Sequence, residues 1–586
     1  MIRPSATRTG AWLLLGVLAP LLAAGPAGAA SPPGKVPPAR GQEAERGVGS
    51  VQELAALLRQ GVSQHCPHPD RVSVTVRSLA SGETLFAHHP DAQRIPASNI
   101  KLATTAAALA VLGPDYTFPT DVYAEDPIRG GTLEGNLYLK GYGDPSLVQE
   151  RLRELARELR LLGLRRVKGA LVADDTYFDA ERYGQGWHAE GSLRPYLAPH
   201  GALSLNFNVV WVMIDPGPEP GAPARVVLEP ETDTVRLEGS VETGPPGGRP
   251  QVRLSRRRVE GRDRVRAGGA IPARSKRVTS PVTVSEPALF AAGGFAAFLK
   301  EQGVEIGGGI RKGATPEEAE LLARTLSRPL GELVRDVNKI SNNFMAEQVL
   351  KTLGAELHGL PGTAEKGLRV VRGFLVSAGV PADSFTLADG SGLSRLNRIS
   401  AAGLAALLAA VHRDFRLRPE FMASLAVVGI DGTARRRIHR ASTVRRVRVK
   451  SGLLDGVNAL SGYGVAENGE ELAFAILSNG NGCHPIQLFR DLTSTMTLLE
   501  RPLPPALSQQ SEEVRRGLAR PMPDPRERDR WRAQGRPRVG PAAPPAADPG
   551  AAEAVSEVPS AAEPAPTGLE FAEPPAAPGG ERGSRP

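Results

Sequence analysis

A serine and a lysine that could form a nucleophile and its base stand three residues apart, as Ser98 and Lys101, at the start of an apolar, alanine-rich stretch. Residues three apart on an α-helix lie on one face, one turn from each other. A lysine half-buried among alanine and leucine can lose its proton near neutral pH, and its free amine can activate a serine hydroxyl. The pair therefore predicts nucleophilic catalysis at a helix N-terminus, although Ser-x-x-Lys alone also arises by chance.

Two further short motifs follow along the chain, Ser341-Asn342-Asn343 and Lys450-Ser451-Gly452. Taken singly, the first is equally compatible with a helix cap or turn, and the second with an exposed strand end. A Ser-x-x-Lys, a Ser-x-Asn and a Lys-(Ser/Thr)-Gly in this order form the motif set of penicillin-binding proteins and class A β-lactamases. The order indicates a serine acyl-transfer site assembled from three distant parts of the chain.

The N-terminus has the composition of an export signal. Two arginines precede an apolar segment at 11–24, and Ala27-Gly28-Ala29 fits a small-residue cleavage site. We therefore predict a signal peptide at 1–30 and an exported protein of the periplasm or cell wall. The segment is too short for a stable membrane span, although an uncleaved anchor is the alternative, and no other segment is long and apolar enough to cross a bilayer.

Two segments outside the expected fold are rich in Pro and charged residues. We predict a linker at 31–48 and a disordered tail at 504–586, because such compositions cannot bury enough apolar surface to fold. The net charge of +8 is spread along the chain and comes largely from arginine. Without an aromatic-interleaved basic patch or zinc-finger spacing, the sequence argues against nucleic-acid binding.

Only two cysteines occur, Cys66 and Cys483. The first follows an amphipathic helix predicted at 51–64, and the second precedes a final helix predicted at 486–499. If these helices pack antiparallel, the cysteines meet and an exported chain can form a disulfide. Two free thiols are one alternative, and a metal site is another because three histidines flank the cysteines: His65, His68 and His484.

Apolar periodicity places the remaining elements. Strands, beginning with a hairpin, are predicted at 72–78, 84–88, 137–139, 170–173, 209–214, 446–450, 460–466 and 471–478. Further helices are predicted at 147–162, 287–302, 330–353 and 402–411. The separation between Ser98 and Ser341 exceeds what one compact catalytic domain needs, so we expect an insertion between these two motifs.

With these features, the chain resembles the class C low-molecular-mass penicillin-binding proteins, the D-alanyl-D-alanine carboxypeptidase/endopeptidase family (peptidase family S13). The resemblance covers about residues 48–503. Beyond the three motifs it rests on longer strings at 143–147, 201–208, 389–395 and 457–463, which are far more specific than Ser-x-x-Lys.

The resemblance implies a mixed α/β (α+β) fold. A penicillin-binding, β-lactamase-like serine transferase domain would carry two smaller domains inserted between the Ser-x-x-Lys and Ser-x-Asn motifs. The corresponding ranges are 48–117 and 318–503 for the catalytic domain, 118–216 and 276–317 for the first inserted domain, and 217–275 for a small β domain.

The resemblance also assigns roles. Ser98 would be acylated, Lys101 would take its proton, and Ser341 would relay a proton to the leaving group with Lys450 as its partner. Asn343 would bind the peptide group of the substrate. Backbone N–H groups of Ser98 and Leu453 would form the oxyanion hole. Peptidoglycan stem peptides and β-lactams are the implied ligands, no cofactor or metal is implied, and the oligomeric state is open.

Two positions depart from the family pattern: Ser451 replaces the usual threonine, and Leu453 replaces a serine or threonine. The first keeps a hydroxyl beside Gly452. The second loses one that helps bind the terminal carboxylate, so we expect weaker binding of terminal D-Ala and a shift toward cross-link cleavage.

Three further residues match positions that in some relatives grip the side chain of the stem-peptide diamino acid: Arg395, Asp175 and Asp455. A surface salt bridge is the alternative for Arg395, and a strand-end turn for Asp175.

Two rival functions share the fold. One is a β-lactamase or esterase, against which the long insertion and the string at 389–395 argue. The other is a wall-binding scaffold without turnover, against which the intact Ser98, Lys101 and Lys450 argue.

Overall fold

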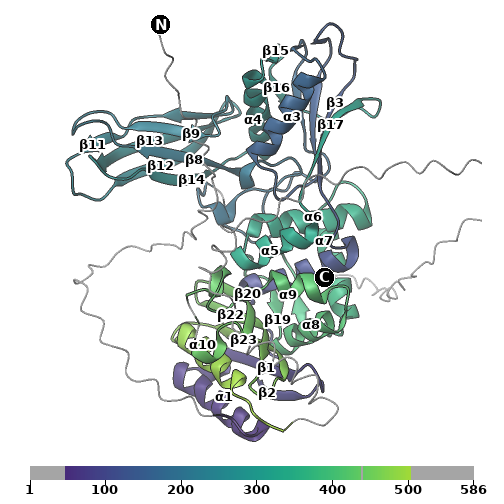
Figure 1. Cartoon of the computed structure of the whole chain (residues 1–586), viewed down its shortest axis with the longest axis vertical. Helices are drawn as coiled ribbons and strands as arrows, with labels where there is room; N and C mark the ends of the chain where they lie inside the picture. The colour runs from purple at the N-terminus through teal and green to yellow at the C-terminus, as the bar shows by residue number, and fades with distance from the viewer. Residues whose placement is uncertain (1–46, 190, 437, 439, 503–586) are drawn as a thin grey trace, which may run out of the picture. The chain divides into compact units, whose positions relative to one another are not determined.

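A six-stranded antiparallel sheet joins the two ends of the described chain and carries the Lys-Ser-Gly motif (Figure 1). The computed structural model describes residues 47–189, 191–436, 438 and 440–502. The predicted signal peptide, most of the linker and the tail lie outside these residues. The strand order is β2-β1-β23-β22-β21-β20, with bounds β1 Val72–Ser78, β2 Thr84–His88, β20 Ala426–Val427, β21 Val447–Leu454, β22 Val457–Val465 and β23 Glu471–Asn479.

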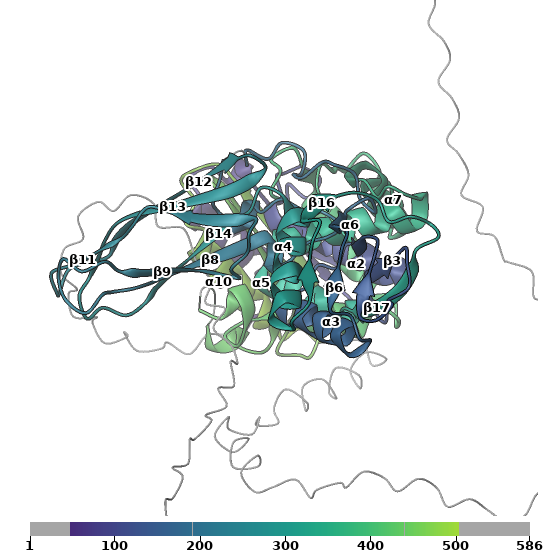
Figure 2. The same ribbon diagram turned by 90° about the horizontal axis from the view of Figure 1, so that it is seen from above.

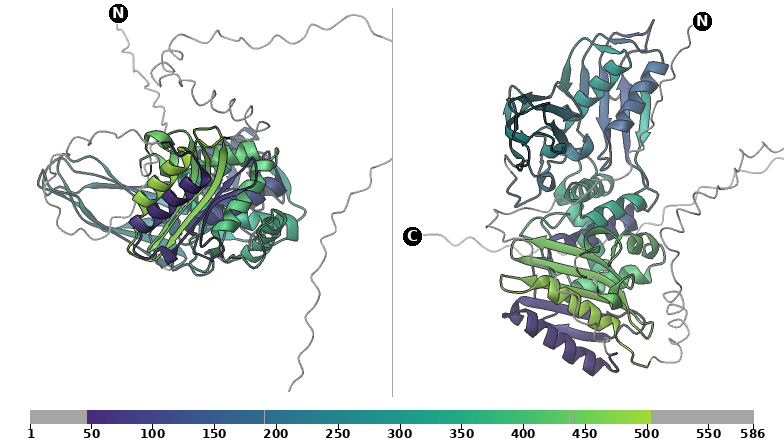
Figure 3. Two further views of the ribbon diagram at one scale, coloured as in Figure 1. Left: turned by 90° about the horizontal axis from the view of Figure 1, so that it is seen from below. Right: turned by 60° about the vertical axis from the view of Figure 1, so that its left-hand side comes forward.

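The first and last helices of the described chain pack against each other on one face of this sheet, as Figure 3 shows. They are α1 (Val51–His65) and α10 (Pro485–Thr497), and α8 (Ala401–Arg413) contacts the sheet through β1, β22 and β23. Cys66 and Cys483 form a disulfide, with 4.2 Å between their Cα atoms. The predicted disulfide is therefore confirmed, and the alternatives of free thiols or a metal at these cysteines are wrong.

A group of buried helices supports the Ser-x-x-Lys and Ser-x-Asn motifs. It contains α2 (Ile100–Leu112), α5 (Leu330–Ile340), α6 (Asn343–His358), α7 (Ala364–Ser377) and α9 (Arg418–Ser424). The single helix predicted at 330–353 is wrong, because Ser341 adopts a left-handed backbone with φ 66° and ends α5. Asn342 then caps α6 by accepting the Met345 N–H at 3.1 Å.

The chain after α2 contributes a five-stranded mixed sheet of order β16-β7-β5-β3-β17, against which α3 (Gln149–Leu161) and α4 (Pro287–Glu301) pack. Its strands are β3 Pro119–Ala124, β5 Leu137–Gly141, β7 Leu171–Asp174, β16 Ile310–Lys312 and β17 Glu320–Leu326. Because β17 pairs with β3, the boundary that we predicted at 317/318 falls before the last strand of this sheet. Short two-residue strands complete this region and the loop before α8: β4 Thr132–Leu133, β6 Arg166–Val167, β15 Glu305–Ile306, β18 Phe385–Thr386 and β19 Arg398–Ile399.

Residues 209–283 form two further sheets, which Figure 2 shows beside each other. One has the order β14-β8-β9, with β8 Val209–Asp215, β9 Arg225–Glu229 and β14 Val278–Thr283, so β8 and β14 lie outside the range 217–275 that we predicted for a small β domain. The other centres on β13 (Arg262–Pro272), which pairs with three strands: β10 Val235–Glu238, β11 Glu242–Gly244 and β12 Gln251–Val259. The apolar core formed by residues between 122 and 323 is separate from the core around α2 and α6. None of the helices in the described ranges has both the length and the apolar character that a bilayer span requires.

Candidate active site

Ser98 lies in a 3₁₀ turn, Ala97–Asn99, that leads directly into α2. The turn packs against β21 and β22. This close approach requires glycine at 452, because a Cβ there would lie 2.8 Å from the Pro96 carbonyl oxygen. The Ser98 side chain is half-buried, so the catalytic candidate faces an accessible edge of the sheet.

Lys101 is fully buried on the first turn of α2. Its Nζ lies 3.1 Å from Ser98 Oγ and donates to Asn343 Oδ1 and to the Ser391 carbonyl oxygen, each at 2.6 Å. Asn343 Nδ2 in turn donates to the Tyr196 carbonyl at 3.0 Å, which fixes the orientation of this amide. Burial lowers the pKa of Lys101 to about 7, and the charges of Asp389 and Glu347 oppose that shift.

Lys450 and Ser341 form the second contact of the site. The fully buried Lys450 donates from Nζ to Ser341 Oγ and to the Ser451 carbonyl, each at 2.8 Å. Burial and the nearby charge of Lys101 hold the pKa of Lys450 well below its usual value. The left-handed backbone at Ser341 breaks the helix, which is why periodicity alone missed this geometry. The three predicted motifs thus meet in one place.

The rest of the third motif lines the edge of β21. Ser451 Oγ donates to Thr433 Oγ1 at 2.7 Å, so the hydroxyl that replaces the usual threonine has a partner. Leu453 leaves 54% of its side chain exposed. Thr433 was not predicted, because it lies in a short turn without a distinctive motif.

The loop at 389–392 packs against the buried side chain of Lys101. Asp389 accepts N–H groups from Gly392 and Ser394 at 2.7 Å, and the indole N–H of Trp187 at 2.8 Å. Glu347, on α6, is buried beside this loop and was also missed. Its only sequence signal is a carboxylate within an otherwise apolar stretch of the Asn343 helix.

Comparison with known proteins agrees with this geometry. The family model described as "D-Ala-D-Ala carboxypeptidase 3 (S13) family" matches residues 56–500. The chain belongs to this carboxypeptidase family. A D-alanyl-D-alanine carboxypeptidase from an Actinomadura species is 37% identical over 423 residues, covering 70% of this chain and 77% of the relative.

Two crystal structures of penicillin binding protein 4 (dacB) from Haemophilus influenzae share the fold of this carboxypeptidase. One has a TM-score of 0.66 at 24% identity, covering 75% of this chain and 99% of that protein. The second, complexed with a β-lactam, has a TM-score of 0.60 at 25% identity over 74% of this chain and 98% of that protein. The predicted family and mixed α/β fold are therefore confirmed.

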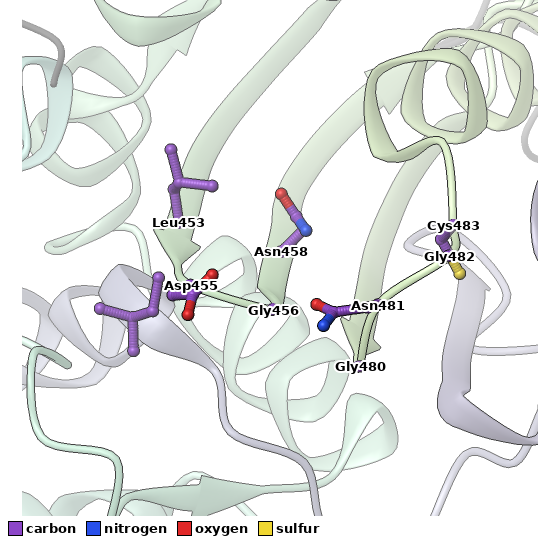
Figure 4. Close-up of a pocket in the computed structure, with 9 residues that line it drawn as sticks. Leu453, Asp455, Gly456, Asn458, Gly480, Asn481, Gly482 and Cys483 are labelled. Atoms are coloured by element: carbon purple, nitrogen blue, oxygen red, sulfur yellow. The ribbon is translucent and has the colours of Figure 1, made fainter. Parts of the chain in front are cut away.

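Arg395 and Asp455 lie together in the carboxypeptidase. The Arg395 guanidinium donates to the Asp455 backbone carbonyl. Both residues line a cavity of about 590 Å³ that also includes Arg71 and Asn481. A neighbouring cavity, drawn in Figure 4, runs along the β21–β22 turn and is lined by Leu453 and Asn458 among others.

Asp175 has a different environment. It directly follows β7, is buried, forms an ion pair with Arg182 at 2.5 Å and accepts the Leu203 N–H at 2.8 Å. Burial raises its pKa, and the Arg182 charge opposes that shift. These contacts agree with the strand-end alternative, because among the described residues Asp175 bonds Arg182 and Leu203 and no bond to Ser98, Lys101 or Lys450 is seen.

Proposed function

We propose that this carboxypeptidase cleaves D-alanyl peptide bonds of peptidoglycan stem peptides through an acyl-Ser98 intermediate. The arrangement of Lys101 carries the proposal. Its two shortest bonds run to Asn343 Oδ1 and the Ser391 carbonyl, and both of these oxygens can only accept. A neutral amine therefore uses both of its hydrogens there and presents its lone pair to the Ser98 hydroxyl, 3.1 Å away.

Acylation then follows from the contacts of the site. Ser98 Oγ attacks the substrate carbonyl carbon while its proton passes to Lys101. The developing oxyanion would accept the backbone N–H groups of Ser98 and Leu453. The peptide C–N bond breaks, the acyl group stays on Ser98, and the amine leaves.

The leaving amine requires a proton, and Ser341 is the proposed donor. Lys450 already donates to Ser341 Oγ, so the hydroxyl hydrogen of Ser341 is free to point at the leaving nitrogen. The proton held by Lys101 would return to Ser341 by way of Lys450, so the proton taken from Ser98 is replaced on Ser341 as the amine leaves. A water molecule then gives its hydroxyl to the acyl carbon, and its proton returns to Ser98 Oγ through Lys101 as the ester bond breaks. β-Lactams would acylate Ser98 by the same attack.

Recognition of the stem peptide would use the cavity beside the β21–β22 turn. The guanidinium groups of Arg395 and Arg71 line it together with the side chains of Asp455 and Asn481, a set suited to a zwitterionic diamino-acid side chain. Asn343 already uses its oxygen for Lys101 and its nitrogen for the Tyr196 carbonyl. We therefore assign Asn343 first to positioning Lys101, and its binding of substrate would require exchange of the Tyr196 contact.

The finer organisation and location belong to the same proposal. The separate core of residues 119–326 supports an insertion between the first two motifs of a serine transferase domain. The disulfide supports export to the periplasm or cell wall, where such bonds persist.

Intact-mass measurement with excess benzylpenicillin tests the proposal. A stable mass gain equal to the drug, absent in Ser98→Ala, is expected. An unchanged mass with intact drug would support the non-catalytic scaffold instead. Loss of drug without a mass gain would indicate a β-lactamase.

A further inference from the structure

Glu347 is a buried carboxylate that the proposed chemistry does not use. It lies on α6 with 1% of its surface exposed, four residues after Asn343. Its Oε1 accepts the Ser391 N–H at 2.8 Å and the Gly390 N–H at 3.1 Å. Burial of a carboxylate without a directly bonded cation costs folding free energy. A residue kept at this cost is expected to have a specific role.

The 390–391 and 391–392 peptide groups each form one hydrogen bond to a carboxylate and one to a side chain of α2. In the 390–391 peptide, the N–H donates to Glu347, and the Gly390 carbonyl accepts Thr104 Oγ1 at 2.7 Å. In the 391–392 peptide, the N–H donates to Asp389 at 2.7 Å, and the Ser391 carbonyl accepts Lys101 Nζ. Glu347 and Asp389 therefore fix both peptide planes, and with them the carbonyl that orients Lys101.

The charges around Glu347 come from three elements. Lys101 faces it from α2, Asp389 from the loop and Lys351 from its own helix, where Lys351 is paired with Asp179 at 2.5 Å. Lys450 acts on the same group of charges through Lys101. Burial and the Asp389 charge raise the pKa of Glu347 to about 8, above the pKa of about 7 for Lys101, so the carboxyl keeps its proton over the range in which Lys101 loses its own.

We propose that Glu347 is a positioning residue for Lys101: its oxygens hold the 389–392 loop against α2 and so fix the Ser391 carbonyl that orients Lys101 Nζ. The role in catalysis rests on the proposed acylation of Ser98. It requires a hydrogen-bond acceptor at position 347 and not a negative charge.

Two substitutions test this requirement. Glu347→Gln keeps an oxygen for the Gly390 and Ser391 N–H groups, whereas Glu347→Ala removes it. Glu356→Gln is the matched control, because Glu356 lies nine residues further along α6 and bonds the hydroxyls of Tyr116 and Tyr177 instead. Thermal unfolding of each variant reports whether it folds.

The first measurement is the rate of acylation by benzylpenicillin from pH 5 to 9. Glu347→Gln should keep the plateau rate within a few-fold and leave the acid limb within about half a unit of the wild type, because it replaces a carboxyl that is already neutral where Lys101 titrates. Glu347→Ala should lower the plateau by about 10²-fold, since the carbonyl that orients Lys101 is released.

The second measurement does not depend on acylation. NMR of ¹³Cε-labelled lysine, with Lys101 assigned by the loss of its signal in Lys101→Arg, gives the titration midpoint directly among the eleven lysines. The midpoint should stay within about half a unit of the wild type in Glu347→Gln and Glu356→Gln and move further in Glu347→Ala, because the freed loop no longer holds the carbonyl that accepts from Lys101 Nζ. An unchanged midpoint or a wild-type plateau in folded Glu347→Ala would overturn the proposal, and so would a plateau in Glu347→Gln as low as that of Glu347→Ala. Failure of the wild type to acylate would refute the proposed function alone, because the midpoint still tests the contact of Glu347 with the loop.

Discussion

Gly392 lies directly against the peptide bond that precedes Ser98: a Cβ at this position would stand 1.8 Å from the Ala97 carbonyl oxygen. Gly392 also has a positive φ of 79°. The turn that presents the nucleophile is therefore braced on one side by this glycine. On the other side, Gly452 of β21 approaches the Pro96 carbonyl.

The first prediction is that Gly392→Ala displaces the Ser98 turn. Backbone strain and the steric clash together should lower the free energy of unfolding by about 2 kcal/mol or more and abolish acylation by benzylpenicillin. Gly113→Ala is the control, because Gly113 at the end of α2 has a similar φ of 83° but open space around its Cα. Equal acylation rates in the two variants would contradict the bracing role.

The second prediction concerns Lys450. Replacing it with methionine removes the 2.8 Å bond to Ser341 while keeping an apolar side chain in the buried site. The acylation rate should fall by about 10²–10⁴-fold, the range for loss of a proton-transfer partner. Ser341→Ala should lower the acylation rate by a similar factor. The double variant should lower it little further, because the two groups act as a unit. If the free-energy effects of the two single variants add fully in the double variant, Lys450 and Ser341 act independently.

The third prediction is the pH dependence of acylation. Lys101 accepts the Ser98 proton only as a neutral amine, and its pKa is lowered to about 7. The rate should therefore rise with pH, with a midpoint near 7, and fall about tenfold per pH unit well below it. Stopped-flow rates at constant ionic strength measure this profile. A midpoint above 9 would mean that burial does not shift Lys101 as described.

The motifs were predictable from sequence because each is short, local and in a fixed order. Ser98 and Lys101 lie one helical turn apart, and periodicity located the strands that carry Lys450. The left-handed residue Ser341 was not predicted, since an apolar pattern continues across the break between α5 and α6.

Long-range hydrogen bonds were the part that sequence could not supply. Glu347 meets the Ser391 N–H across 44 positions, and Thr433 meets Ser451 across 18. The surroundings of Asp175 likewise depend on Arg182 and Leu203, which no local pattern connects to it. Such contacts are set by tertiary packing rather than by local propensity.

The fourth prediction tests the disulfide. Cys66→Ala combined with Cys483→Ala removes a crosslink between residues 417 positions apart. The free energy of unfolding should fall by about 2–4 kcal/mol, because the unfolded chain gains conformational freedom. Urea denaturation of the double variant, compared with the oxidised and reduced wild type, measures the change. The reduced wild type should match the variant, and equal midpoints for all three samples would refute a stabilising role.

The fifth prediction concerns Leu453, whose exposed side chain stands at the end of β21 where the family usually has a hydroxyl. Leu453→Thr should restore a donor for the terminal carboxylate of the substrate. A hydrogen bond to a charged group contributes about 1.5–3 kcal/mol, so kcat/KM for a D-Ala-D-Ala peptide should rise about 10–100-fold. Cleavage of cross-links to a simple side-chain amine such as that of lysine, which has no carboxylate beside the scissile bond, should change little.

Leu453→Val is the matched control for this substitution. Valine has the shape of threonine and the same preference for strands but no hydroxyl, so it isolates the hydrogen bond from the change in side-chain size. Carboxypeptidase turnover should rise only in the threonine variant. If threonine and valine give the same turnover of the D-Ala-D-Ala peptide, the loss of the hydroxyl at 453 does not explain the specificity of this enzyme.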